Sequence, residues 1–319
     1  MKMILLLTIL SFATVVQAQS VIKETFIYSV KGQDTLRLDR YSNPSFQDIK
    51  PCVIFVFGGG FVGGTRDDEG YIPYFEFLAN EGYAVASIDY RLGLKKAQES
   101  GEMTGDLTNM FSFMRQSVAM AVEDIVDATD YIIKNADKWQ IDPQMIVASG
   151  SSAGALTVLH AEYDLCNDGP LTQKLPSDFN YAGVIAFAGA ILSEGELTWQ
   201  YRPAPIMFFH GDADKNVPYN VLVIDNAGFE VGIYGSLGIS SQFNELGYSY
   251  YFHSVENAAH EISWKPMQEN LDEIRIFLNR FVWNKQPLII NTSSFSMDSP
   301  EVKKDFELED YLRTNNLIP

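Results

Sequence analysis

Residues 145–154 read Met-Ile-Val-Ala-Ser-Gly-Ser-Ser-Ala-Gly, and this stretch decides the fold. Its first five residues form a short apolar run, which is typical of a buried strand. Gly150 and Gly154 enclose Ser152 in the pattern G-x-S-x-G, and residues 153–163 then read as a helix. A strand that turns directly into a helix at such a pattern holds the serine in a strained bend and needs small neighbours. The stretch therefore predicts a sharp turn that exposes the Ser152 hydroxyl at the carboxyl edge of a sheet.

The rest of the chain alternates apolar runs with helical periodicity. Residues 118–136 place their apolar side chains on one helical face, and residues 21–41 predict an antiparallel hairpin around a polar turn. Apolar runs predict further strands over residues 52–57, 83–88, 183–188, 205–209 and 248–253. Apolar strands separated by helices imply an α/β fold with a mostly parallel sheet covered by helices on both faces.

Composition limits the partners of the 319-residue chain. Asp and Glu number 41 against 23 Lys and Arg, which gives a formal net charge of −18. Because nucleic-acid affinity depends on Lys and Arg that neutralise phosphates, this balance argues against a nucleic-acid partner. Candidate site residues spread from Gly59 to His260, which favours one domain over residues 19–283. A polar tail follows over residues 284–319, with an acidic helix expected around residues 300–313.

Residues 1–18 have the pattern of a targeting segment. Lys2 precedes an apolar stretch, and Val16 and Ala18 supply small residues at the −3 and −1 positions of a cleavage site. The pattern predicts a secretory signal peptide, and therefore a periplasmic or secreted protein. An uncleaved anchor is the alternative, but the apolar run is shorter than the roughly 20 residues that span a bilayer. We expect no stable membrane insertion.

A nucleophilic serine needs a base, and the base needs an acid that orients it. In a fold with this strand-to-helix turn, the acid and then the histidine follow the serine along the chain. His260 lies in a loop just past a predicted strand and is preferred to His253, which falls inside that strand. Asp212 and Asp214 both follow the preceding strand. Asp214 lies deeper in the loop and is preferred, so Asp212 is interpreted as a solvated turn residue.

Oxyanion donors are expected from two backbone segments. Gly58-Gly59-Gly60 follows the strand at residues 52–57, and glycine lets backbone N–H groups turn toward a substrate. The N–H groups of Gly59 and Gly60, together with that of Ala153 after the serine, are the candidate donors.

Residues 93–117 separate a strand from its helix and are longer than a usual α/β loop. The segment is a candidate lid over the site, although its aromatic residues could simply pack on the core. Phe61, Phe111 and Phe113 are the candidate residues of a substrate pocket.

These motifs resemble the α/β-hydrolase superfamily, and within it the carboxylesterases of the hormone-sensitive-lipase and bacterial feruloyl/acetylxylan esterase kind. The resemblance runs from about residue 50 to about residue 283. Three departures from the family pattern are Phe57 in place of a histidine, Ser151 in place of a frequent acid, and Ala155 in place of a frequent glycine. Four segments carry the resemblance in order: Phe57-Gly58-Gly59-Gly60-Phe61, Asp89-Tyr90-Arg91-Leu92, Gly150–Gly154 and His210-Gly211-Asp212-Ala213-Asp214 with Val217-Pro218.

The resemblance implies an α/β-hydrolase fold and an exported serine esterase that needs no metal or cofactor. Ser152, Asp214 and His260 match the family's reacting positions. Small-molecule or polysaccharide-linked esters are the expected substrates. A serine exopeptidase of the same fold and an inactive binding module are the alternatives. The resemblance also suggests a disulfide between Cys52 and Cys166, because both would lie at the amino edge of the sheet. Oligomeric state does not follow from the sequence.

Overall fold

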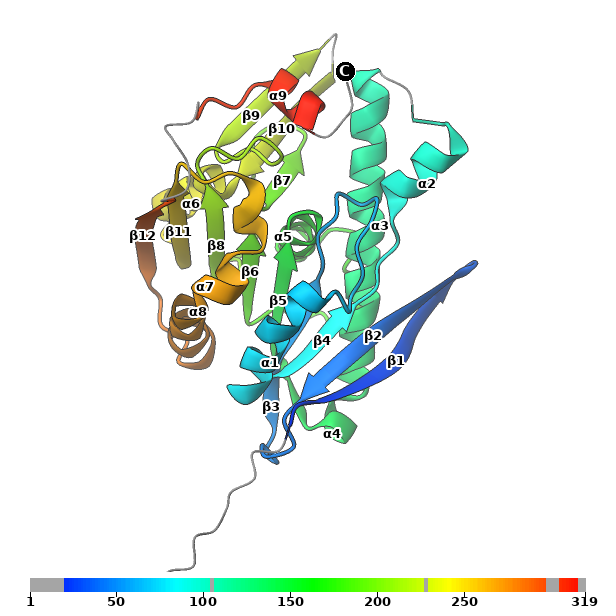
Figure 1. Cartoon of the computed structure of the whole chain (residues 1–319), viewed down its shortest axis with the longest axis vertical. Coiled ribbons are helices and arrows are strands. Elements are labelled where there is room, and N and C mark those ends of the chain that lie inside the picture. The colour runs from blue at the N-terminus through cyan, green and yellow to red at the C-terminus, as the bar shows by residue number, and fades with distance from the viewer. Residues whose placement is uncertain (1–19, 104–105, 227–228, 297–303, 315–319) are drawn as a thin grey trace, which may run out of the picture.

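The computed structural model describes residues 20–103, 106–226, 229–296 and 304–314, and the predicted leader at residues 1–18 lies outside these ranges. Within them the main sheet holds nine strands (Figure 1). Their order across the sheet is β1 (Ile22–Lys31), β2 (Asp34–Ser42), β4 (Ala84–Ile88), β3 (Lys50–Val56), β5 (Ile141–Ser151), β6 (Gly183–Phe187), β8 (Ile206–Gly211), β11 (Tyr250–Glu256) and β12 (Ile289–Phe295).

Strand direction confirms the predicted fold class. All pairs from β4 to β12 are parallel, whereas β1 with β2 and β2 with β4 are antiparallel. The predicted hairpin is therefore joined to the edge of a parallel sheet. Since the carboxyl ends of parallel strands meet at one edge, the loops after β3, β5, β8 and β11 lie close together.

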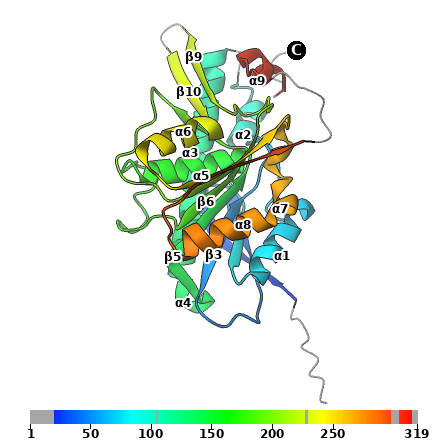
Figure 2. The ribbon, with the colours of Figure 1, turned by 90° about the vertical axis from the view of Figure 1, so that its left-hand side faces the viewer.

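Helices cover both faces of the sheet, as Figure 2 shows. One layer contains α1 (Ile72–Asn80), α7 (Pro266–Glu269) and α8 (Leu271–Phe277), which continues as the π-helical segment η3 (Leu278–Trp283). The opposite layer contains α3 (Leu107–Lys134), α5 (Ala153–Leu165) and α6 (Ser236–Leu246). Short helices complete the description: η1 (Glu69–Tyr71), α2 (Gly93–Ser100), α4 (Ala136–Trp139), η2 (His260–Ser263) and α9 (Leu308–Thr314). No helix in the described ranges combines the length and the apolar character needed to cross a membrane.

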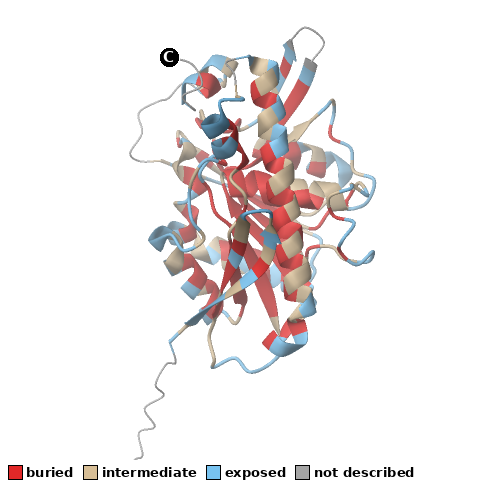
Figure 3. Cartoon of the chain, turned by 90° about the vertical axis from the view of Figure 1, so that its right-hand side faces the viewer, coloured by how far each residue is buried: buried red, intermediate tan, exposed pale blue. Residues whose placement is uncertain are grey.

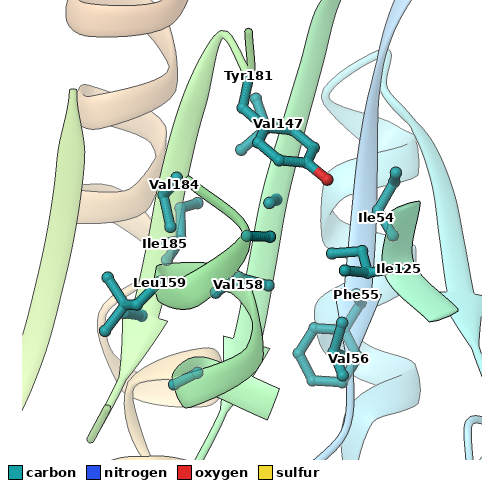
Figure 4. Packing of buried hydrophobic residues seen from close by; sticks show 14 of the residues in the cluster. Ile54, Phe55, Val56, Ile125, Val147, Val158, Leu159, Tyr181, Val184 and Ile185 are labelled. Carbon is teal, nitrogen blue, oxygen red and sulfur yellow. The ribbon is translucent and has the colours of Figure 1, made fainter. Parts of the chain in front are cut away.

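The core lies between the sheet and its two helical layers, and burial is concentrated there (Figure 3). Figure 4 shows residues of β3, β5 and β6 packed with residues of α3 and α5. Ile54, Phe55 and Val56 of β3 have no exposed surface, because both faces of this strand are covered. The buried Tyr181 hydroxyl lies 3.0 Å from the Thr129 hydroxyl, so this polar group in the core is satisfied.

A second, smaller sheet was not foreseen. It contains β7 (Ala190–Ser193), β10 (Phe229–Gly235) and β9 (Val221–Asn226), paired antiparallel within the described residues. The candidate lid at residues 93–117 is largely helical, since it contains α2 and the first turns of α3. The sheet also extends past residue 283, because β12 adds to its edge from within the expected tail.

The suggested disulfide between Cys52 and Cys166 is wrong. Both cysteines are buried and unbridged. Cys52 lies in β3 beside β4 and β5, whereas the Cys166 carbonyl accepts a hydrogen bond from Tyr201, in the segment that leads into β8. The two cysteines therefore have different neighbours in the fold. The Cys166 thiol instead donates to the Glu162 carboxylate.

Candidate active site

Ser152 lies at the turn between β5 and α5 in a backbone conformation that side chains rarely adopt. Its φ and ψ are 49° and −116°, and its N–H donates to the Phe187 carbonyl. The two glycines of the pattern are required by close contacts. A Cβ on Gly150 would lie 2.2 Å from the Gly154 carbonyl oxygen, and one on Gly154 would lie 2.0 Å from the Val56 carbonyl oxygen. Bare backbone at both positions thus lets β3, β5 and α5 meet closely enough to present the serine.

Three loops at the carboxyl edge of the sheet bring the predicted residues together. Ser152 follows β5, Asp214 follows β8, and His260 begins η2 after β11. Ser152 Oγ lies 2.8 Å from His260 Nε2, and His260 Nδ1 lies 2.7 Å from Asp214 Oδ2. The proton on Nδ1 is fixed by the carboxylate, which leaves Nε2 free to accept the serine proton. The arrangement is therefore that of a nucleophile, a base and an orienting acid.

The Asp214 carboxylate is buried and is held in its charged form. Burial by itself would raise the pKa of Asp214, but the interactions of its carboxylate with His260 and His210 outweigh burial and hold the pKa well below its usual range. Asp214 Oδ1 also accepts the backbone N–H groups of Asn216 and Val217. His210, which the sequence analysis names only as part of a motif, faces Asp214, with Nε2 3.3 Å from Oδ2.

The rejected candidates lie elsewhere. Asp212 accepts a hydrogen bond from the Asn257 N–H and pairs with Lys304 at 2.9 Å. Its carboxylate therefore links the loop after β8 to the loop after β11 and to residue 304. His253 contacts Thr292 and Ser294 of β12. His160, the remaining histidine of the four in the sequence, lies between the Leu156 carbonyl and the Leu192 N–H.

The glycine loop after β3 has the geometry of an oxyanion site. Gly59 and Gly60 adopt φ values of 124° and 61°, and a Cβ on Gly59 would lie 2.3 Å from the Gly63 carbonyl oxygen. In the part of the chain that the structure describes, the N–H groups of Gly59, Gly60 and Ala153 have no hydrogen-bond partner. All three residues line the cavity above Ser152. These N–H groups are therefore available to an oxyanion.

Two tyrosines hold this loop where the family pattern has a histidine. The Tyr90 hydroxyl donates to the Phe57 carbonyl at 3.1 Å, and the Gly58 N–H donates to the Tyr71 hydroxyl at 3.3 Å. The Phe57 ring packs on Tyr90 with centroids 4.5 Å apart. Aromatic packing and two hydroxyls thus fix the loop. Tyr90 belongs to a motif noted in the sequence, but no sequence signal pointed to Tyr71.

Ser151 links the serine turn to the histidine loop. Its hydroxyl donates to the Ser263 carbonyl at 2.8 Å, at the end of η2. Ser151 is one of the departures from the family pattern, and here it fastens the segment that carries His260.

A cavity of about 660 Å³ opens above Ser152. Phe61 and Phe111 line it, but Phe113 does not, which corrects the expectation for this residue. Phe113 is partly buried against the main core, because it lies two positions from Phe111 and so on a different side of α3. Unforeseen lining residues include Tyr71, Met114, Leu192, Ile233, Trp264 and Tyr311. No cluster of three His, Cys, Asp or Glu residues suited to a metal ion occurs in the described ranges.

The family model described as BD-FAE matches residues 38–120 and 112–191, which is just under half of the chain. Among curated proteins, the chain is 28% identical to gut esterase 1 of Caenorhabditis elegans over 130 residues, which is 41% of this chain and 21% of that protein. It is 26% identical to a probable isoprenylcysteine α-carbonyl methylesterase of Arabidopsis thaliana over 136 residues, 43% of this chain and 26% of that protein. The chain thus spans about a fifth to a quarter of these relatives.

Solved structures extend the similarity over most of the chain. Apo esterase 2 of Thermogutta terrifontis superposes with a TM-score of 0.58 at 21% identity, over 81% of this chain and 94% of that one. The propionate-bound form of the same esterase gives a TM-score of 0.57 at 22% identity, with the same coverage. At this level of identity, the likeness shows that the chains share a fold.

Proposed function

We propose that this chain, which has the fold of the α/β-hydrolase esterases it resembles, is a serine carboxylesterase that hydrolyses carboxylic esters through Ser152, His260 and Asp214. The observation that carries the proposal is the continuous line of hydrogen bonds from Ser152 Oγ through His260 to Asp214 Oδ2. Ser152, at one end of this line, lines the same open cavity as the Gly59, Gly60 and Ala153 N–H groups, which have no partner among the described residues.

The reaction has two halves. Ser152 Oγ attacks the acyl carbon while His260 Nε2 accepts the hydroxyl proton, and the Gly59, Gly60 and Ala153 N–H groups stabilise the oxyanion. Collapse of this intermediate releases the alcohol, which takes its proton from His260, and leaves an acyl-enzyme. Water then attacks the acyl-enzyme with His260 as base, and the acid departs. Asp214 stays charged and orients the imidazole throughout.

A sugar hydroxyl on a polysaccharide is the proposed alcohol partner. Support comes from the cavity lining, which contains Trp264, whose side chain is 46% exposed, and the polar residues Thr65, Asp68 and Gln268. An exposed aromatic ring and polar side chains in one cavity suit the apolar face and the hydroxyls of a sugar. The leader pattern at residues 1–18 supports an exported enzyme that meets such polymers outside the cell.

Kinetics on p-nitrophenyl acetate test the proposal. Wild type is expected to turn over the ester, and Ser152→Ala is expected to lower kcat by about 10⁴- to 10⁶-fold. Equal rates for the two proteins would contradict hydrolysis and favour a binding module. Turnover of dipeptide anilides without turnover of esters would favour an exopeptidase.

Covalent labelling gives an independent test. An esterase 2 structure from Thermogutta terrifontis is described as phosphorylated by paraoxon. We expect paraoxon to add one diethylphosphoryl group to this chain and none to Ser152→Ala, as read by intact mass.

Export is tested by expressing the full chain with its leader. A mature protein that begins at Gln19 and is found in the extracellular or periplasmic fraction would support cleavage of the leader. Retention of the leader in membranes would favour an anchor.

A further inference from the structure

The cavity above Ser152 has one polar part and one apolar part. The polar part is described above and includes Trp264 and Gln268, which follow His260 along the chain. The apolar part is lined from α3, α5, the small sheet and α9. In Figure 1, α9, β10 and β7 lie above the start of α5, and α7 lies below it. The larger apolar residues that line the cavity from these elements are Phe111, Met114, Leu156, Leu192, Ile233 and Tyr311.

The position of the base decides which part receives the acyl chain. His260 must give its proton to the departing alcohol oxygen, so the alcohol lies beside His260 and the residues that follow it. The acyl group then extends away from His260, along the apolar lining. An unbranched hydrocarbon chain is the group that gains most from such a surface.

Helix α9 closes this apolar part. Tyr311 is buried, and its ring stacks on Phe111 with centroids 6.4 Å apart and planes at 18°. Tyr311 and Leu312 form a small buried cluster with Met110 of α3. The next turn of α9 adds Thr314 to the cavity lining. The helix is therefore seated on the start of α3 by apolar contacts.

Ion pairs attach the same segment to the loop of the acid. Lys215, the neighbour of Asp214, lies 3.1 Å from Asp310 of α9 and also donates to the Asp305 carbonyl. Lys304 lies 2.9 Å from Asp212 and 3.0 Å from Glu256. Each exposed pair contributes little stability, but together they fix the direction in which residues 304–314 run.

We propose that α9 is the end wall of the acyl part of the cavity, and that the Tyr311 ring sets the longest acyl chain that the enzyme accepts. The inference rests on the proposed ester hydrolysis. Because Tyr311 is held between Phe111 and the cluster around Met110, a chain that reaches it must displace a packed ring. Tyr311 is in this view a specificity-determining residue that takes no part in proton transfer.

Relative rates along a p-nitrophenyl series from acetate to laurate test the proposal on the full chain. Tyr311→Ala is expected to raise the ratio of kcat/KM for laurate to kcat/KM for acetate by about 10-fold. One methylene group that does not fit an apolar pocket lowers kcat/KM by about 10-fold or more, and the variant removes the ring that excludes it. Tyr311→Phe keeps the ring and should keep the wild-type ratio. Tyr311→Leu keeps an apolar contact with Met110 and should give an intermediate ratio.

Two results would overturn the proposal. One is a uniform loss of activity over all chain lengths in Tyr311→Ala, which would indicate a purely structural role. The other is a shift along a series of acetate esters with lengthening alcohols, which would place Tyr311 on the alcohol side. Trp264→Ala is the matched variant for the alcohol series and is expected to change that series alone.

Binding separates this proposal from the proposed function. If wild type hydrolyses no ester, the proposed function fails. The affinity of laurate for the Ser152→Ala protein then tests whether Tyr311 limits the length of the bound chain. If laurate binds the Ser152→Ala/Tyr311→Ala protein about 10-fold more tightly than the Ser152→Ala protein, the result supports Tyr311 as the end wall. Equal affinities would refute it.

Discussion

His210 Nε2 lies 3.3 Å from Asp214 Oδ2, the same oxygen that faces His260 Nδ1 at 2.7 Å. His210 Nε2 also lies 3.2 Å from the Val217 carbonyl, and its Nδ1 lies 2.8 Å from the Ser236 hydroxyl. Both neighbours of Nε2 are acceptors, so this nitrogen carries the proton and Nδ1 accepts from Ser236. His210 and His260 therefore hold the same oxygen of the Asp214 carboxylate.

His210→Leu is expected to lower kcat by about 10-fold, because loss of a hydrogen bond to a charged group costs about 1.5–3 kcal/mol. His210→Gln retains a donor and should recover most of the activity. The measurement is kcat on p-nitrophenyl acetate, together with urea unfolding of both variants. Equal kcat values for His210→Leu and His210→Gln would contradict the idea that the hydrogen bond donated by His210 positions Asp214.

Tyr71→Phe removes the hydroxyl that accepts the Gly58 N–H. We expect a fall of about 10-fold in kcat with little change in KM, because the Gly59 and Gly60 donors act mainly on the oxyanion. Tyr90→Phe, which loses the bond to the Phe57 carbonyl, is the matched variant and should behave alike. An effect on KM alone would assign Tyr71 to ground-state binding instead.

Gly154→Ala is expected to destabilise the fold by about 3 kcal/mol or more, since its Cβ would collide with the Val56 carbonyl. Gly247→Ala is the control. Gly247 ends α6 at a φ of 67° with open space around it, so its cost should be about 1–2 kcal/mol from backbone strain alone. Urea unfolding compares the two, and equal losses would contradict the close packing of β3 on α5.

Glu162 predicts a pH dependence of stability. Burial raises the pKa of Glu162 to about 7 from 4.5, although the Ala204 N–H and the Cys166 thiol both donate to it. The folded chain thus keeps the proton that the unfolded chain releases. This contribution to stability is complete below about pH 4.5 and is lost as the pH rises to about 7.

Glu162→Gln should abolish that loss. Relative to the variant, wild type is expected to lose about 3 kcal/mol of unfolding free energy between pH 4.5 and pH 8. Glu245→Gln, at an exposed position of α6, is the surface control. Parallel stability curves for wild type and Glu162→Gln would contradict the raised pKa.

The buried strands and the site triad could be predicted because their signals are local. β3, β5, β6, β8 and β11 are covered on both faces, so each reads as a continuous apolar run. Ser152, Asp214 and His260 each follow such a run. β12 gave no such signal, because it is an edge strand with mostly exposed side chains. Tyr71 of η1 and Tyr311 of α9 line the cavity only because these short helices pack there in the folded chain, and the sequence does not reveal that packing.

Residues 304–314 are synthesised after Ser152, Asp214 and His260, yet α9 completes the cavity that those residues serve. A growing chain that ends before Lys304 already contains every reacting group but lacks the wall at Phe111. In the proposed enzyme, the side chain that limits the acyl chain therefore comes from a segment that is added after all three reacting groups.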